Sequence, residues 1–148
     1  MFDHRRVLVA LDGSPASEAV LRFVLEIAGP LDMTVLLVRV IEPSVPPMSD
    51  DAEEYLAPIA AALRARGVET AWMVRCGGPE NEILATADES GVDMIAMATH
   101  GRTGMGRLLF GSVAEAVLRR ATVPVLMIRQ PERVRTPAPP VTPYPAYI

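Results

Sequence analysis

The stretch M-I-A-M-A-T-H-G-R-T-G-M-G-R-L-L-F-G-S-V-A-E-A-V-L-R-R-A, residues 94–121, decides the fold. It opens with the apolar run Met94 to Ala98, which is typical of a strand buried on both faces. Thirteen residues with four glycines follow, and then Ser112 stands three residues before Glu115, in the S-x-x-E spacing of a capping box. A strand, a glycine-rich loop and a helix start in this order predict an anion site, because glycines let a phosphate approach backbone N–H groups.

A second interpretation of this stretch needs no ligand. Glycines also end strands, and the S-x-x-E pattern begins many helices that bind nothing. The chain contains no lysine, so the P-loop signature G-x-x-x-x-G-K-[ST] is absent. From the pattern alone, a phosphate site and a plain connection both remain open.

Composition and charge limit the class of protein. The 148 residues carry a net charge of −4, and their fourteen basic residues are all scattered arginines, which argues against a nucleic-acid interface. The single cysteine, Cys76, has no partner for a disulfide or a cysteine metal site, which favours a reducing compartment. Because no signal peptide and no long apolar run occur, we expect a cytoplasmic protein without a membrane partner.

Strand-like and helix-like segments alternate along the chain. The helices are predicted from Ser14-Pro15 to Gly29, from Ser49 or Asp50 to Gly67 with a break or kink at Pro58, from Pro79 to Gly91, and from Ser112 onward. The strands are predicted at residues 7–11, 34–41, 68–74, 94–98 and 125–128. This alternation indicates an α/β domain over residues 1–130, with a parallel sheet and helices on both faces.

With these motifs in place, the sequence resembles the universal stress protein family over about residues 4–130. The nucleotide-binding members carry Gly, two residues, Gly, nine residues, and Gly followed by Ser or Thr. Here the second glycine is Gly101, the nine residues are Arg102 to Phe110, and the final pair is Gly111 and Ser112. Ala98 takes the place of the first glycine. The segments V-L-V-A-L-D-G-S and P-V-L-M-I-R extend the resemblance to both ends of the domain.

The resemblance implies a single doubly wound, Rossmann-like domain whose five parallel strands have the order 3-2-1-4-5. That order reverses between strands one and four, and ligands bind at such a switch point, beyond the carboxyl ends of the strands. It also implies that ATP, with or without Mg²⁺, is bound there, and that two copies dimerise through the edge strand Val125 to Ile128. Little or no catalysis is expected, at most slow ATP hydrolysis.

The resemblance also implies roles for individual residues. Asp12 is expected to accept hydrogen bonds from ribose hydroxyls, or else to form the turn in D-G-S. Val40 is expected to hold the adenine edge through its backbone. The predicted nucleotide site comprises Leu11, Asp12, Val40, Met97, Ala98, His100, Gly101, Arg102, Gly111, Ser112 and Val113.

Ala98 leaves two outcomes open. If the family's glycine is needed for a positive φ, the methyl group costs about 1 kcal/mol, or roughly fivefold in affinity. If compactness alone is needed, alanine is nearly neutral.

The C-terminal segment, residues 131–148, is a tail that holds six prolines and two tyrosines and has no long apolar run. It is expected to be a polyproline-like spacer or a contact for a protein partner.

Two other functions compete with ATP binding: a nucleotide-free dimeric adaptor of the same fold, and a hydrolase or nucleotidyltransferase of the wider α/β group. A phosphoacceptor receiver domain is excluded, because it needs an acidic pair after the first strand and a lysine near the last.

Overall fold

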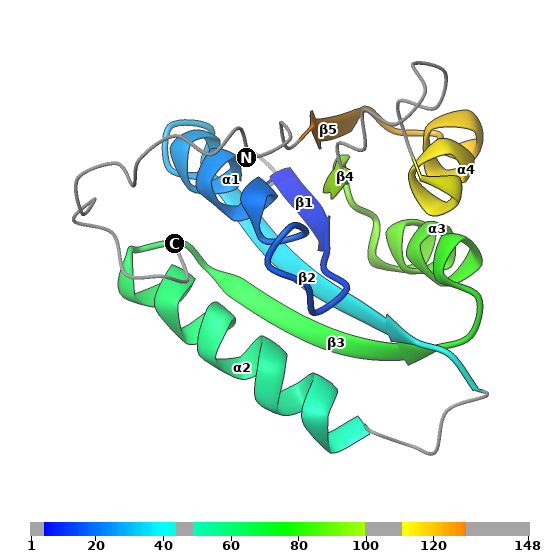
Figure 1. The fold of residues 1–148 in the computed structure, drawn as a ribbon. Helices are drawn as coiled ribbons and strands as arrows, with labels where there is room; N and C mark the ends of the chain where they lie inside the picture. Colours follow the sequence, from blue (N-terminus) through cyan, green and yellow to red (C-terminus); the bar gives the residue numbers. More distant parts are fainter. Residues whose placement is uncertain (1–4, 44–48, 100–110, 130–148) are drawn as a thin grey trace, which may run out of the picture.

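The computed structural model describes residues 5–43, 49–99 and 111–129, of which residues 49 and 50 are described by their backbone alone. Strands and helices alternate throughout these residues, as the sequence predicts (Figure 1). They are β1 (Arg5–Ala10), α1 (Ala19–Ala28), β2 (Met33–Ile41), α2 (Ser49–Ala65), β3 (Thr70–Cys76), α3 (Pro79–Ser90), β4 (Met94–Thr99), α4 (Ser112–Arg120) and β5 (Val125–Arg129).

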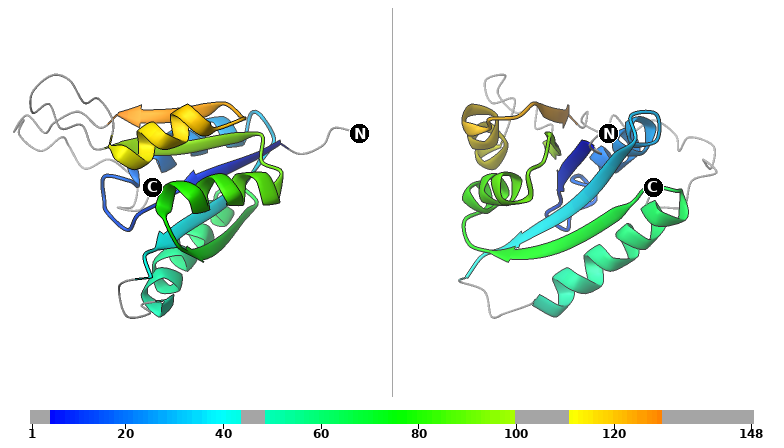
Figure 2. Two further views of the ribbon diagram at one scale, coloured as in Figure 1. Left: turned by 90° about the vertical axis from the view of Figure 1, so that its right-hand side faces the viewer. Right: turned by 180° about the vertical axis from the view of Figure 1, so that it is seen from behind.

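The strands form one parallel sheet in the order β3-β2-β1-β4-β5, which confirms the predicted doubly wound fold. β2 and β3 are added in turn on one side of β1. The chain then crosses back, and β4 pairs with the other side of β1. Both views of Figure 2 show α1 and α2 on one side of the twisted sheet and α3 and α4 on the other. The switch point therefore lies between β1 and β4.

Two apolar layers follow from the alternation of side chains along each strand. On the face covered by α1 and α2, Val7, Val9 and Leu37 are fully buried. On the face covered by α3 and α4, Leu8 and Ile95 are fully buried. Because β1 and β4 pack on both faces, their buried parts are continuous apolar runs rather than alternating ones.

Several expected boundaries differ from the structure by one to four residues, and the starts of α1 and β3 show the local hydrogen bonds involved. Helix α1 begins at Ala19 rather than at Pro15, although Ser14 Oγ does accept a hydrogen bond from Ser17 N–H, as a capping residue would. Strand β3 begins at Thr70 rather than at Val68, because Val68 N–H donates to the Leu63 carbonyl and so closes the end of α2.

The predicted break at Pro58 is wrong. Helix α2 runs through this residue without interruption. Proline removes one N–H donor, which leaves the carbonyl of Glu54 without its helical partner. Both Pro58 and Glu54 are exposed, so that carbonyl can bond to water instead. The proline therefore interrupts hydrogen bonding only on the solvent side of the helix.

Two further expectations concern the C-terminal tail and membrane-spanning helices. The tail, residues 131–148, lies outside the described part of the chain. Within the described ranges, no helix has both the length and the apolar character that a membrane span requires.

Leu37→Ala is predicted to lower the free energy of unfolding by about 2–5 kcal/mol, because this fully buried side chain would leave a cavity in the layer under α1 and α2. Urea unfolding followed by circular dichroism measures the change. Leu31→Ala is the matched control, since Leu31 is 48% exposed and its truncation should cost less than about 1 kcal/mol. Equal losses in the two variants would contradict the two-layer description of the core.

Candidate functional site

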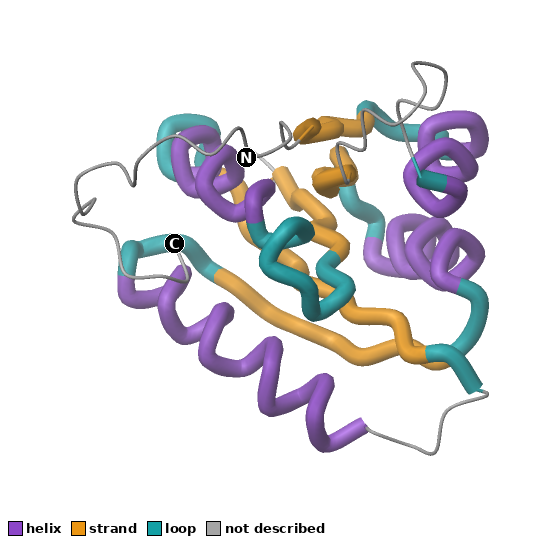
Figure 3. Tube along the Cα trace, viewed as in Figure 1, coloured by secondary structure: helices purple, strands orange, loops and turns teal. Residues whose placement is uncertain are grey.

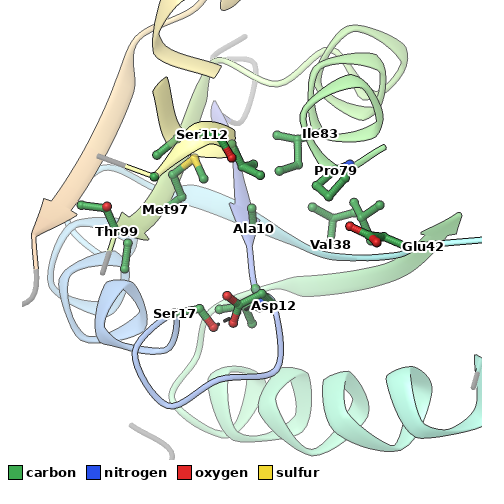
Figure 4. A pocket seen from close by; sticks show the side chains of 16 residues that line it. Ala10, Asp12, Ser17, Val38, Glu42, Pro79, Ile83, Met97, Thr99 and Ser112 are labelled. Carbon is green, nitrogen blue, oxygen red and sulfur yellow. Dashed lines mark hydrogen bonds between the residues drawn. The ribbon is translucent and has the colours of Figure 1, made fainter. Parts of the chain in front are cut away.

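A pocket of about 380 Å³ opens at the carboxyl ends of β1, β2 and β4 and is closed by the first turns of α3 and α4 (Figure 4). Figure 4 shows Pro79, Ile83, Val38 and Glu42 at one end, Met97 and Thr99 at the other, and Asp12 and Ser17 along one side. Its lining residues are Ala10, Leu11, Asp12, Ser17, Val38, Val40, Glu42, Pro79, Ile83, Met97, Ala98, Thr99, Gly111, Ser112, Val113 and Ala114.

The floor of the pocket comes from strand residues on one face of the sheet. Ala10, Val38 and Met97 belong to the layer under α3 and α4, and Val40 packs against it. Thr99 lies two residues after Met97 and so shares its face. These side chains are small or apolar, so the floor suits a flat apolar ligand group.

The loop between β1 and α1 forms one wall (Figure 3, where loops are teal). Leu11 N–H donates to the Val38 carbonyl at 2.9 Å, which ties the start of the loop to β2. Asp12 Oδ1 accepts hydrogen bonds from the Ser14 N–H, at 2.8 Å, and from the Ser14 hydroxyl. Asp12 N–H in turn donates to Ser17 Oγ. The turn-forming role expected of Asp12 is therefore present, and its carboxylate lies at the pocket wall.

Behind this loop, an aromatic and charged cluster supports Gly13. Gly13 has φ +88°, and the Arg39 guanidinium lies 3.0 Å from where a Cβ would stand. Arg39 also stacks over the Tyr55 ring, with Cζ 5.0 Å from the ring centroid. The Tyr55 hydroxyl donates to Glu18 Oε1 at 2.9 Å. Burial, and then the hydrogen bond to Glu18, raise the pKa of Tyr55, so its hydroxyl remains a donor at neutral pH.

The predicted capping box at α4 is wrong. Gly111 is the N-cap, Ser112 is already the first helical residue, and no side chain caps this helix start. Glu115 instead pairs with Arg119 on the helix surface. Because intrahelical bonding begins with Glu115 N–H and the Gly111 carbonyl, the three preceding N–H groups of α4 have no helical acceptor. Those groups belong to pocket-lining residues, and the helix dipole adds partial positive charge there.

Helix α3 forms the opposite wall. Arg75 on β3 pairs with Glu82 at 2.9 Å and with Glu89 at 2.8 Å, and both carboxylates stand on α3. These two pairs raise the pKa of Arg75, the Glu89 hydrogen bond first. They attach α3 to the sheet and so set the position of Pro79 and Ile83 at the pocket. These salt bridges therefore help to position the pocket wall, although none of their residues lines the pocket.

The structure brings most of the predicted nucleotide residues together. Predicted residues that line the pocket are Leu11, Asp12, Val40, Met97, Ala98, Gly111, Ser112 and Val113. His100, Gly101 and Arg102 lie outside the described residues and stay predictions.

Ala98 belongs to strand β4, and Asp32 is the one non-glycine residue of the described chain with positive φ. The first reason for a glycine at position 98, a positive φ, therefore does not apply.

Sequence reasoning missed several lining residues. Ser17, Glu42, Pro79, Ile83 and Thr99 were not expected at the site. Strand periodicity could have found Thr99, which follows the strand residue Met97 by two positions. The spatial approach of α3 could not be read from any local pattern. In the described part of the chain, no group of three or more His, Cys, Asp or Glu side chains could hold a metal ion.

Comparison with known proteins agrees on one family. The model of the universal stress protein family matches residues 3–129. Universal stress protein MJ0531 of Methanocaldococcus jannaschii is 31% identical over 145 residues, with 88% of this chain and 85% of that protein covered. With several other universal stress proteins, the match covers only about half of their length or less.

Solved structures agree with this match. A universal stress protein from Archaeoglobus fulgidus has a TM-score of 0.70 at 29% identity, with 86% of this chain and 99% of that one covered. A structure of the universal stress protein from the same organism in complex with dAMP has a TM-score of 0.67 at 27% identity, with the same coverage. The similarity in each case extends over the whole α/β domain.

Gly13→Ala is predicted to lower the free energy of unfolding by about 1–2 kcal/mol, because φ +88° is unfavourable for a residue with a Cβ. Chemical denaturation measures the loss. Gly78→Ala is the matched control: Gly78 has φ −71° and ψ 128°, a conformation that alanine adopts readily before Pro79, and the nearest atom to its Cβ is 3.6 Å away. A loss in Gly78→Ala as large as that in Gly13→Ala would contradict the conformational explanation.

Proposed function

The chain belongs to the universal stress protein family, and we propose that it binds an adenine nucleotide, ATP first, in the pocket beyond β1, β2 and β4. One observation carries this proposal. Eight residues expected to bind nucleotide come from four separate stretches of the sequence and line a single pocket at the switch point of the sheet. A Rossmann-like fold binds nucleotides at that place.

The backbone of Val40 supports adenine recognition. The pairing of β1 with β2 ends at Ala10 and Val38, and the Val38 carbonyl accepts from Leu11 N–H. Backbone groups of a strand alternate in direction, so Val40 N–H and C=O face the side of Val38, where β1 has ended. Ile41, one residue on, faces β3, since its carbonyl accepts from Gly77 N–H. Val40 therefore offers one donor and one acceptor to the edge of a base.

The two ends of the pocket suit different parts of a nucleotide. Val38, Pro79 and Ile83 supply apolar contacts for the base at one end, where the carboxylate of Glu42 also lies. The start of α4 offers three N–H groups and the positive end of its dipole to phosphate. Asp12 lies between them, where its carboxylate can accept ribose hydroxyls, since a carboxylate has about four lone-pair sites.

Magnesium fits the site only as a companion of the phosphates. Mg²⁺ is held by one or two carboxylates together with phosphate oxygens and water. Asp12 is a carboxylate on the pocket wall, and the described residues offer no cluster of three ligands. We therefore propose that Mg²⁺ enters with ATP, through the phosphates and at most Asp12.

The proposal gives the protein a regulatory rather than a catalytic role. The described pocket residues include no lysine, arginine or histidine that could neutralise a developing phosphoryl charge, and the predicted site residues His100 and Arg102 lie outside the described residues. At most slow ATP hydrolysis is expected. A nucleotide-free adaptor of the same fold is the second candidate, and Ala98 in place of glycine is the feature that favours it.

A homodimer through β5 belongs to the same proposal. In the described sheet β5 is an edge strand that pairs with β4 on one side. Its residues Val125 to Ile128 are apolar and only half-buried. Pairing with β5 of a second copy would give the unpaired backbone groups of this edge hydrogen-bond partners, and sedimentation velocity would detect the dimer.

The cytoplasmic location and a partner of the tail, residues 131–148, remain predictions.

Purified protein is predicted to release adenine nucleotide when denatured, and to bind ATP when the ligand-free form is titrated by calorimetry. ATP, AMP and cyclic AMP, titrated in parallel, rank the ligands. No detectable binding at millimolar ATP would favour the adaptor. Turnover of many ATP molecules per site per minute would instead favour an enzyme.

Gly111→Val is predicted to abolish ATP binding while the thermal unfolding midpoint stays within a few degrees of wild type. A Cβ at Gly111 meets no atom of the described residues within 4 Å, so this part of the fold tolerates it, but the side chain would occupy space beside the start of α4. Gly78→Val is the matched control, because Gly78 is also an N-cap glycine with extended backbone and its Cβ points to Asn81. Unchanged affinity in Gly111→Val would remove the start of α4 from the site.

A further inference from the structure

Thr99, the last residue of β4, carries a polar group that the fold leaves unused. The residue is 3% exposed, and Thr99 Oγ1 is buried without a hydrogen-bond partner. It is the one such side-chain atom among the described residues. A buried hydroxyl without a partner costs about 1–3 kcal/mol, so its presence asks for an explanation.

The other buried threonines show what this fold does when a hydroxyl is structural. Thr70 Oγ1 donates to the Val68 carbonyl at 3.0 Å, and Thr86 Oγ1 donates to the Glu82 carbonyl at 2.6 Å. Both are as buried as Thr99. Thr70 is the first residue of β3 and so lies at the amino ends of the strands, whereas the pocket lies at their carboxyl ends. Thr99 differs from both because its side chain lines the pocket (Figure 4).

Thr99 shares a face of the sheet with the start of α4. Side chains alternate along β4, so Thr99 lies on the same face as Met97. Met97 packs in one cluster with Ala114 and Val117 of α4. The unused hydroxyl and the first N–H groups of α4, which have no helical acceptor, therefore lie on the same side of the pocket.

We propose that the Thr99 hydroxyl is a phosphate-binding group, which donates a hydrogen bond to a phosphate oxygen of the bound nucleotide beside the first turn of α4. This inference rests on the proposed nucleotide binding and adds a residue to it. Thr99 Oγ1 is shielded in its present rotamer, so contact with a phosphate requires a change of χ1. Staggered χ1 positions differ by 120°, and no hydrogen bond holds the present one. A bound phosphate would then supply the hydrogen-bond partner that the protein does not.

The test is a pair of threonine-to-valine substitutions, because valine keeps the shape of threonine and removes only the hydroxyl. Thr99→Val is expected to weaken ATP binding at least about tenfold, the size of a hydrogen bond to a charged group. Its ligand-free unfolding midpoint is expected to be no lower than that of wild type, because no hydrogen bond is lost. Thr70→Val should show the reverse: a lower midpoint, since the Val68 carbonyl loses its donor, and unchanged ATP affinity.

One further ligand, adenosine, and one further variant, Thr99→Ser, make the result specific. Adenosine should bind Thr99→Val as well as wild type, since it has no phosphate, and Thr99→Ser should keep ATP affinity within about threefold of wild type. Equal ATP affinity in wild type and Thr99→Val would overturn the inference and leave nucleotide binding intact. A loss as large for adenosine as for ATP would also overturn it, because the hydroxyl would then contact the nucleoside. If wild type itself binds no nucleotide, the proposed function fails, and the role of Thr99 fails with it.

Discussion

The early end of β1 is the constraint on which the site depends. β1 pairs with β2 only as far as Ala10 and Val38, whereas β2 continues to Ile41 and stays paired with β3 on its other side. Beyond Val38, the edge of β2 that faces β1 has no strand beside it in the described sheet. A buried backbone donor or acceptor without a partner is unfavourable. The fold therefore keeps a length of strand edge at the bottom of a pocket, where a ligand can pair with it.

The loop after β1 and the starts of α3 and α4 then give this gap its walls. The bond from Leu11 N–H to the Val38 carbonyl holds the start of the loop against β2, and the bonds between Asp12 and Ser14 fix the turn that follows. Arg75 attaches α3 to β3, so the far wall depends on two ion pairs outside the pocket. Because the walls come from elements distant in sequence, the pocket exists only in the folded domain.

Much of this architecture was predictable, since it depends on periodicity. The alternation of apolar runs and amphipathic segments predicted each strand and helix, and D-G-S after the first strand predicted a turn. Capping was not predictable, because Gly111 with extended backbone served as the N-cap and left Ser112 inside the helix. Glu42 and Ile83 entered the site through tertiary packing, which no local pattern encodes. Pro58 failed as a helix breaker because its side of the helix is exposed to solvent.

Ala98 tests whether the departure from the family motif matters. Its backbone lies in a β-strand, so it does not need the conformational freedom of glycine. Its side chain packs with the layer under α1, whereas Met97 and Thr99 on either side face α4. The methyl group thus points toward the opposite face of the sheet from the start of α4, where phosphate binding is proposed. On this geometry the substitution of glycine by alanine costs the phosphate site little, and the balance between a nucleotide-binding protein and a nucleotide-free adaptor shifts toward binding.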